Sequence, residues 1–198
     1  MSGIVERAIE SAGLGALRSA RQVGRLSEDA VERLKKADLL ALGALADQVR
    51  KQEVGDDVRV YIDATPAEAG PGVVLIAAGE GEATGLDLLR QVAVCRVTGP
   101  RGVSVRVDWT SCGLEIAQVA LGFGANELCG RIANKRGLLI AADELSGVGK
   151  KSQRELARVA KRKEIAGYVK RAGRVPVFIE AELPGESASR VASSQDAQ

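Results

Sequence analysis

Five residues in the middle of this sequence have side chains suited to binding a ligand. Asp108, Trp109 and Cys112 follow a stretch that alternates between apolar and other residues, and Asn126 and Glu127 lie in a glycine-rich segment shortly afterwards. Strand ends are where α/β proteins assemble their ligand sites. We therefore predict that these five residues line a ligand-binding site, and we assign none of them a catalytic role.

The sequence contains no histidine, which removes the side chain best suited to proton transfer near neutral pH. Triads of the Ser-His-Asp type, Cys-His pairs and histidine-containing zinc sites are all excluded. The three cysteines, Cys95, Cys112 and Cys129, are too far apart to suggest a local metal loop, so we favour buried thiols and predict no metal site. Cys112 precedes a predicted helix, whose N-terminus is expected to lower the pKa of its thiol.

Composition favours a globular protein without an extended charged surface. The 198 residues are 45% hydrophobic and carry a net charge of +2, which gives no general reason to expect nucleic acid or a membrane as partner. A basic region over 150–174 fits a solvated helix face, with an anion-binding or partner-binding face as the alternative. The absence of a long apolar run or a secretory leader pattern predicts a cytoplasmic protein.

Hydrophobic periodicity predicts strands that alternate with helices. We expect strands at 58–62, 73–78, 103–109, 138–142 and 175–179, and helices at 4–12, 27–51, 85–97, 114–122 and 152–172. The region 27–51 is either one helix or two helices that meet near Asp38, and Pro176 favours a sheet edge or a strand start for the last strand. This order predicts an α/β fold, either a partial (βα) barrel or a small, largely parallel sheet with N-terminal helices. The predicted organisation is an N-terminal helical extension at 1–23, one α/β domain at 24–183 and a disordered tail at 184–198.

Three stretches, 24–58, 84–127 with its Gly-Ala-Asn-Glu loop, and 172–177, resemble one family. This is the family of radical S-adenosylmethionine enzymes of menaquinone and deazaflavin-cofactor synthesis: aminofutalosine synthase, dehypoxanthine futalosine cyclase and the deazaflavin synthase subunits. The resemblance implies a Cys-x-x-x-Cys-x-x-Cys loop for an iron–sulfur cluster after the first strand, but Tyr61 and Ile62 lead into Asp-Ala-Thr-Pro instead. Residues 63–83 stand where such enzymes have most of their barrel, and Glu127 replaces their usual aspartate.

These departures favour a catalytically degenerate relative that needs no cofactor and acts as a binding or assembly subunit. An incomplete barrel exposes strand edges, which predicts a homo-oligomer or docking on a full-length radical S-adenosylmethionine relative. The alternative is a small enzyme of menaquinone-type cofactor metabolism that uses a remodelled pocket without an iron–sulfur cluster. A redox or metal-dependent regulator using the three thiols is a further possibility.

Overall fold

A five-stranded parallel sheet organises the chain in the computed structural model, which describes residues 2–24, 26–62, 71–77, 85–131 and 161–179. The strands are β1 (Asp57–Ile62), β2 (Val73–Ile76), β3 (Ser104–Asp108), β4 (Glu127–Gly130) and β5 (Val175–Ile179). Their order across the sheet is β2-β3-β4-β1-β5, and every pair is parallel. Among the described residues the sheet does not close, which confirms the predicted partial barrel or small parallel sheet.

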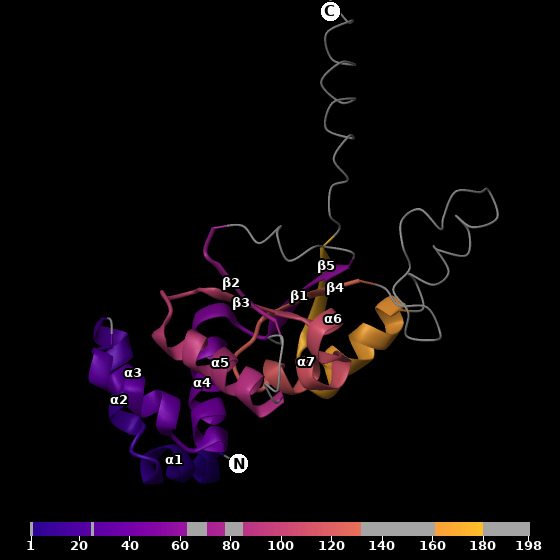
Figure 1. The fold of residues 1–198 in the computed structure, drawn as a ribbon. Coiled ribbons are helices and arrows are strands. Elements are labelled where there is room, and N and C mark those ends of the chain that lie inside the picture. Colours follow the sequence, from indigo (N-terminus) through magenta and orange to yellow (C-terminus); the bar gives the residue numbers. More distant parts are fainter. Residues whose placement is uncertain (1, 25, 63–70, 78–84, 132–160, 180–198) are drawn as a thin grey trace, which may run out of the picture.

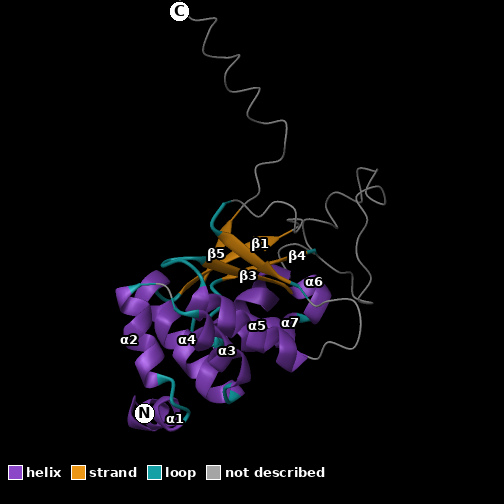
Figure 2. Cartoon of the chain, turned by 60° about the vertical axis from the view of Figure 1, so that its left-hand side comes forward, coloured by secondary structure: helices purple, strands orange, loops and turns teal. Residues whose placement is uncertain are grey.

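The helices lie on one side of this sheet. They are α1 (Ser2–Ser11), α2 (Gly15–Val23), α3 (Glu28–Lys36), α4 (Leu39–Val54), α5 (Gly85–Thr98), α6 (Trp109–Cys112) and α7 (Leu114–Leu121), with a further helical segment at 161–171. From β2 through β3 and β4 to β5 the chain always steps in the same direction, so right-handed crossovers place the connecting helices on one face. Figure 1 and Figure 2 show this one-sided arrangement, with α6 at the end of the sheet.

Local capping explains why the predicted helical region at 27–51 divides in two. The Ser27 hydroxyl accepts a hydrogen bond from the backbone N–H of Ala30, which caps α3. The chain is extended at Ala37, and the Asp38 carboxylate then accepts from Ala41 N at 2.9 Å to cap α4. The predicted break near Asp38 is therefore confirmed.

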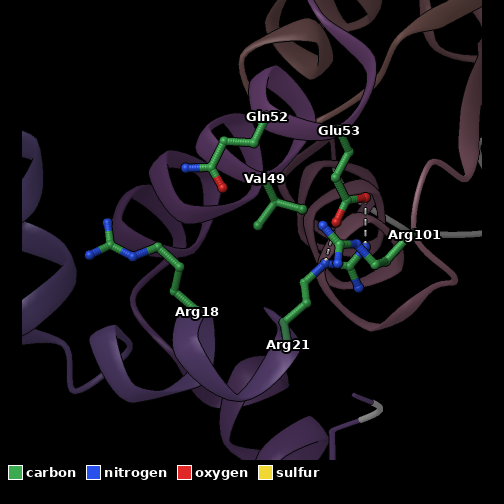
Figure 3. A pocket seen from close by; sticks show the side chains of 6 residues that line it. All are labelled: Arg18, Arg21, Val49, Gln52, Glu53 and Arg101. Atoms are coloured by element: carbon green, nitrogen blue, oxygen red, sulfur yellow. Dashed lines mark hydrogen bonds and ion pairs between the residues drawn. The ribbon is translucent and has the colours of Figure 1, made fainter. Parts of the chain in front are cut away.

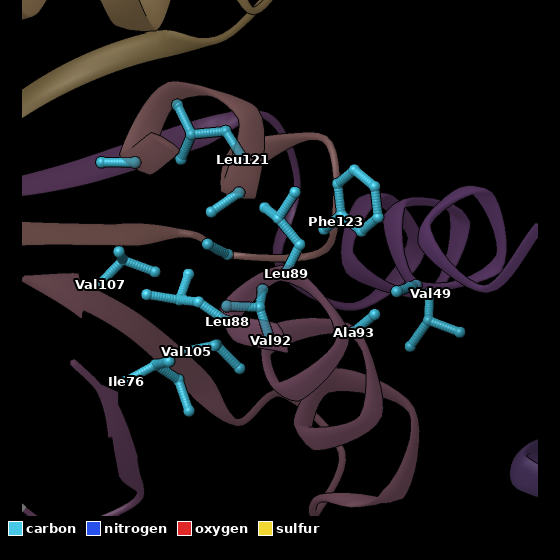
Figure 4. Close-up of a cluster of buried hydrophobic side chains, with 14 of the residues drawn as sticks. Val49, Ile76, Leu88, Leu89, Val92, Ala93, Val105, Val107, Leu121 and Phe123 are labelled. Carbon is cyan, nitrogen blue, oxygen red and sulfur yellow. The ribbon is translucent and has the colours of Figure 1, made fainter. Parts of the chain in front are cut away.

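The hydrophobic core lies between the sheet and the helices. Val58, Val60 and Ile62 alternate with more exposed residues along β1 and face the helices. Helix α5 lies between the sheet and α4: Leu88 and Val92 belong to the same buried cluster as strand valines and α4 side chains (Figure 4). Burial of a side chain of this size contributes about 1.5–3 kcal/mol, so α5 is central to stability.

Two predictions about strands have different outcomes. Pro176 was expected at an edge or a strand start, and β5 is indeed an edge strand. Val175 N donates to Asp56 O, so Val175 turns its backbone toward β1 and Pro176, the next residue, faces outward, where its missing N–H costs no ladder bond. The prediction that the Gly-Ala-Asn-Glu segment forms a loop was wrong in part, because Glu127 begins β4, a buried strand between β3 and β1.

Other predictions concern parts of the chain that the structure does not describe. The predicted strand at 138–142 and the tail at 184–198 lie outside the described residues, as do much of 63–83 and the first part of the helix at 152–172. Within the described ranges, none of the helices is both long enough and apolar enough to cross a membrane.

Candidate functional site

The face of the sheet opposite the helices carries the most unusual side chains. We call it the helix-free face, because none of the described helices covers it (Figure 1 and Figure 2). It consists of alternate residues of the five strands: Val73 and Leu75 of β2, Ser104, Arg106 and Asp108 of β3, Glu127 and Cys129 of β4, Asp57, Arg59 and Tyr61 of β1, and Val175, Val177 and Ile179 of β5. The intervening residues of the strands face the helices and contribute to the core.

The strand register aligns one residue from each strand in a row across this face. Leu75 pairs with Arg106, Arg106 with Glu127, Glu127 with Arg59, and Arg59 with Val177. The centre of the row is therefore an arginine–glutamate–arginine cluster, and both ends are aliphatic. Charged residues at adjacent central strand positions are uncommon in a buried sheet and call for an explanation.

Glu127 is the centre of this cluster. Its side chain is 1% exposed and forms ion pairs with Arg106 Nη2 at 2.8 Å and Arg59 Nε at 3.2 Å. Arg106 Nε also donates to the carboxylate, at 2.9 Å, and Arg59 Nη2 donates to the Ser104 hydroxyl at 3.2 Å. Because both guanidinium groups engage the carboxylate, Glu127 orients the arginines and is poorly placed to accept a proton from a substrate.

Arg59 and Tyr61 are the groups of this cluster that can meet a ligand or partner. The Arg59 side chain is 48% exposed, whereas the Arg106 side chain is 4% exposed. The Tyr61 ring lies 3.9 Å from the Arg106 guanidinium carbon in a cation–π contact, which covers that arginine and fixes the ring. The accessible part of the cluster is therefore the Arg59 guanidinium beside the Tyr61 ring, between two aliphatic strands.

Asn126 lies just before the face and binds other parts of the chain. Its Oδ1 accepts from Arg96 Nη2 at 2.6 Å and from Val105 N at 2.8 Å, and the residue is 2% exposed. Arg96 is fully buried and donates also to Gly124 O at 2.8 Å and Val103 O at 2.5 Å. Burial lowers the pKa of Arg96 to about 10, and its hydrogen-bond acceptors are neutral oxygens.

The buried position of Arg96 also explains why the Gly-Ala-Asn-Glu segment begins with glycine. Gly124 has a φ of +103°, and a Cβ there would lie 2.8 Å from the Arg96 side chain and 3.2 Å from that of Ala46. Only glycine allows the backbone to come this close to the buried arginine. Gly124 and Asn126 therefore hold Arg96, and Arg96 joins α5 to the starts of β3 and β4.

Asp108 and Trp109 lie at the carboxyl end of β3, as predicted. The Asp108 carboxylate accepts from Thr110 N at 2.8 Å and caps the short helix α6. Trp109 is 5% exposed, its Nε1 donates to Arg131 O at 3.2 Å, and its ring covers Gly130, where an added Cβ would lie 2.5 Å away. Trp109 thus anchors α6 against the end of β4.

Cys112 differs from the expectation of a reactive thiol. It ends α6, and its thiol can donate to Asp108 O at 3.4 Å. Burial, with the nearby Asp108 charge, raises the pKa of Cys112 to about 11. Burial likewise raises the pKa of Cys129 to about 12, and it raises the pKa of Cys95. The predicted lowering at Cys112 was wrong, because burial and a negative neighbour outweigh the following helix.

The five residues predicted from the sequence therefore separate into two groups. Glu127 and Asp108 lie on the helix-free face, whereas Asn126, Trp109 and Cys112 make contacts that hold the chain together. Sequence reasoning did not single out Arg59, Tyr61 or Arg106. The signal for them was present: polar residues occupy every second position of two predicted strands, and these positions share one face.

The described residues include no group of three or more histidine, cysteine, aspartate or glutamate side chains that could hold a metal ion. All three cysteines belong to this part of the chain, and each is a free thiol. The arrangement can bind an anionic or hydrogen-bonding group through Arg59 and Tyr61.

Comparison with known proteins shows that the chain is similar to an enzyme. The chain is 29% identical over 147 residues to 5-amino-6-(D-ribitylamino)uracil–L-tyrosine 4-hydroxyphenyl transferase 2 of Methanosarcina mazei. The match covers 70% of this chain but 35% of that protein, so the chain spans about a third of the relative's length. No protein-family model and no solved structure matches. The similarity supports a relationship to the radical S-adenosylmethionine superfamily and does not single out one family within it.

Proposed function

We propose that this protein is a catalytically degenerate member of the radical S-adenosylmethionine group that acts as a binding or assembly subunit. It would associate through the helix-free face, either with a second copy or with a full-length relative. The observation that carries the proposal is the row from Leu75 through Arg106, Glu127 and Arg59 to Val177, whose ends are aliphatic and whose centre is ordered by ion pairs.

The exposed valines at one end of this row support an interface. Val175 is 54% exposed and Val177 is 37% exposed, and both are on the helix-free side of β5. Pro176 presents no N–H on the outer edge of β5, which disfavours addition of another strand there. Association through the face, with the valines buried and Arg59 meeting an acidic or polar group, fits this surface better than pairing along the β5 edge.

The sequence that follows β1 supports the loss of radical chemistry. Ile62 ends β1 and is followed in sequence by Asp-Ala-Thr-Pro, without the cysteines that the resemblance implies for a cluster loop. The three cysteines present lie on α5, α6 and β4, and their thiols favour the protonated form. Metal ligation requires thiolates, so these positions are poorly suited to replace a cluster loop.

Light scattering after size-exclusion chromatography tests the assembly role, both for the protein alone and after mixing with a full-length relative from the same organism. The proposal predicts a stable homo-oligomer or a stoichiometric complex. A monomer that binds neither a second copy nor the relative would contradict the proposed assembly role.

The competing proposal is a small enzyme of menaquinone-type cofactor metabolism that uses a remodelled pocket without a cluster. The observation in its favour is the position of Tyr61 next to the last residue of β1, at the carboxyl edge where parallel sheets bind ligands, with Arg59 two residues before it on the same face. The variants Arg59→Gln and Tyr61→Phe test it. If both variants keep the wild-type thermal shift with every ligand that stabilises the protein, this enzyme proposal is excluded.

A further inference from the structure

A cavity of about 180 Å³ lies at the N-terminal helices, away from the helix-free face. We call it the arginine pocket. Six residues line it: Arg18 and Arg21 of α2, Val49, Gln52 and Glu53 of α4, and Arg101 of the turn before β3. Figure 3 shows the Arg21 and Arg101 side chains gathered at Glu53, while the Arg18 guanidinium lies at the opposite end of the pocket and points away from them.

Arg21 and Glu53 form the rigid wall of the pocket. Arg21 donates to the Glu53 carboxylate from Nε at 3.0 Å and from Nη2 at 2.9 Å, and it donates to Val97 O at 2.6 Å and Gly99 O at 2.8 Å. Glu53 also accepts from Gly102 N at 2.9 Å. The pair thereby neutralises the one carboxylate of the pocket and joins α2, α4 and the end of α5.

The other two arginines provide unused donors. All hydrogen bonds of Arg18 to Glu6 and Gln48 come from its Nη1, which leaves Nη2 and Nε without a bond to any described residue. Arg101 is exposed, and its side chain forms no hydrogen bond or ion pair with the described part of the chain. The lining carries three positive charges and one negative charge, and Glu6 beside Arg18 reduces the net charge further without reversing it.

The size and donors of the pocket indicate its ligand. Pockets for drug-sized or cofactor-sized molecules measure about 300–1,000 Å³, so this one suits a smaller group. The cavity is several times larger than the roughly 30 Å³ that one water occupies in the liquid, so it can hold a phosphoryl group. Guanidinium forks match phosphate oxygens in geometry and charge. We propose that the arginine pocket binds a small phosphate-class dianion through Arg101, beside the fixed Arg21–Glu53 pair, with Arg18 adding positive charge at the opposite end of the pocket.

Isothermal titration at low salt tests the proposal with three probes: inorganic phosphate, glycerol 3-phosphate and succinate. The variant Arg101→Gln removes one charge from the pocket, and Lys170→Gln, an exposed charge on the helical segment at 161–171, is the matched control. We expect wild-type protein to bind phosphate saturably, Arg101→Gln to weaken binding about tenfold or more, and Lys170→Gln to bind as wild type.

The probes distinguish the possible sources of the phosphoryl group. Tighter binding of glycerol 3-phosphate supports the proposal and identifies a monoester ligand, whereas equal binding supports it and identifies the free ion. Three results would overturn it: no saturable binding at about 10 mM phosphate, equal loss in Arg101→Gln and Lys170→Gln, or succinate binding as tightly as phosphate. Circular dichroism of each variant establishes that it is folded.

Discussion

Substitution of Asn126 by alanine should destabilise the protein severely, because this residue satisfies two buried donors. Arg96 Nη2 and Val105 N both bond to Asn126 Oδ1, and Arg96 and Val105 are each 0% exposed. An unsatisfied buried donor costs about 1–3 kcal/mol, and more when it is charged, so we expect a loss of about 3–5 kcal/mol. This is a large part of the roughly 5–15 kcal/mol by which domains are stable.

Urea unfolding followed by circular dichroism measures this loss. With a slope of about 2 kcal/mol per molar urea, the midpoint of Asn126→Ala should fall by about 2 M while the slope stays constant. Asn126→Asp keeps an acceptor oxygen and should lose less, and Gln91→Ala, an exposed amide on α5, should stay within about 0.5 kcal/mol of wild type. An Asn126→Ala midpoint equal to that of Gln91→Ala would refute the structural role of Asn126.

Three other expectations follow from buried groups. Glu127→Gln leaves Arg106 without its carboxylate and should lower the free energy of unfolding by about 3 kcal/mol; an unchanged urea midpoint would contradict this. The raised pKa values of Cys112 and Cys129, about 11 and about 12, predict slow alkylation by iodoacetamide at pH 8 in the folded protein and fast alkylation in urea, as followed by mass spectrometry. Because the pKa values of both thiols are higher in the folded protein than the ordinary value of 9.0, the thiols of the unfolded chain ionise first as the pH rises. The contribution of the neutral thiols to the free energy of unfolding is therefore complete below pH 9 and is lost as the pH rises through the folded-state values. Urea midpoints that stay constant above pH 9 would contradict this.

The sequence predicts the architecture well where local chemistry decides it. Alternation identifies β1 and β3, and the capping residues Ser27 and Asp38 place the starts of two helices. The sequence does not predict β4, because its four residues are all buried and therefore show no alternation, and they include a cysteine and a glycine rather than typical strand formers.

The candidate site is less predictable because it depends on register. Arg59, Arg106 and Glu127 come from three strands that are distant in sequence, and only their alignment in the sheet brings them together. Asn126 has a structural role because it binds Arg96, and in the sequence Arg96 is an ordinary charged position on an amphipathic helix. A buried arginine whose bonds go to backbone oxygens and one amide leaves no charge pattern in the sequence that could reveal it.

Sedimentation velocity of one variant decides whether the helix-free face binds a second copy or a full-length relative. Val177→Glu places a charge in the proposed interface beside Arg59, where an opposite-charge pair keeps the monomer folded. Leu40→Glu, at a 74% exposed position in the first turn of α4, is the matched control. Each protein is sedimented alone and mixed with a full-length relative from the same organism. We expect wild type and Leu40→Glu to form the same assembly and Val177→Glu to sediment as a folded monomer; identical sedimentation of all three would contradict association through this face.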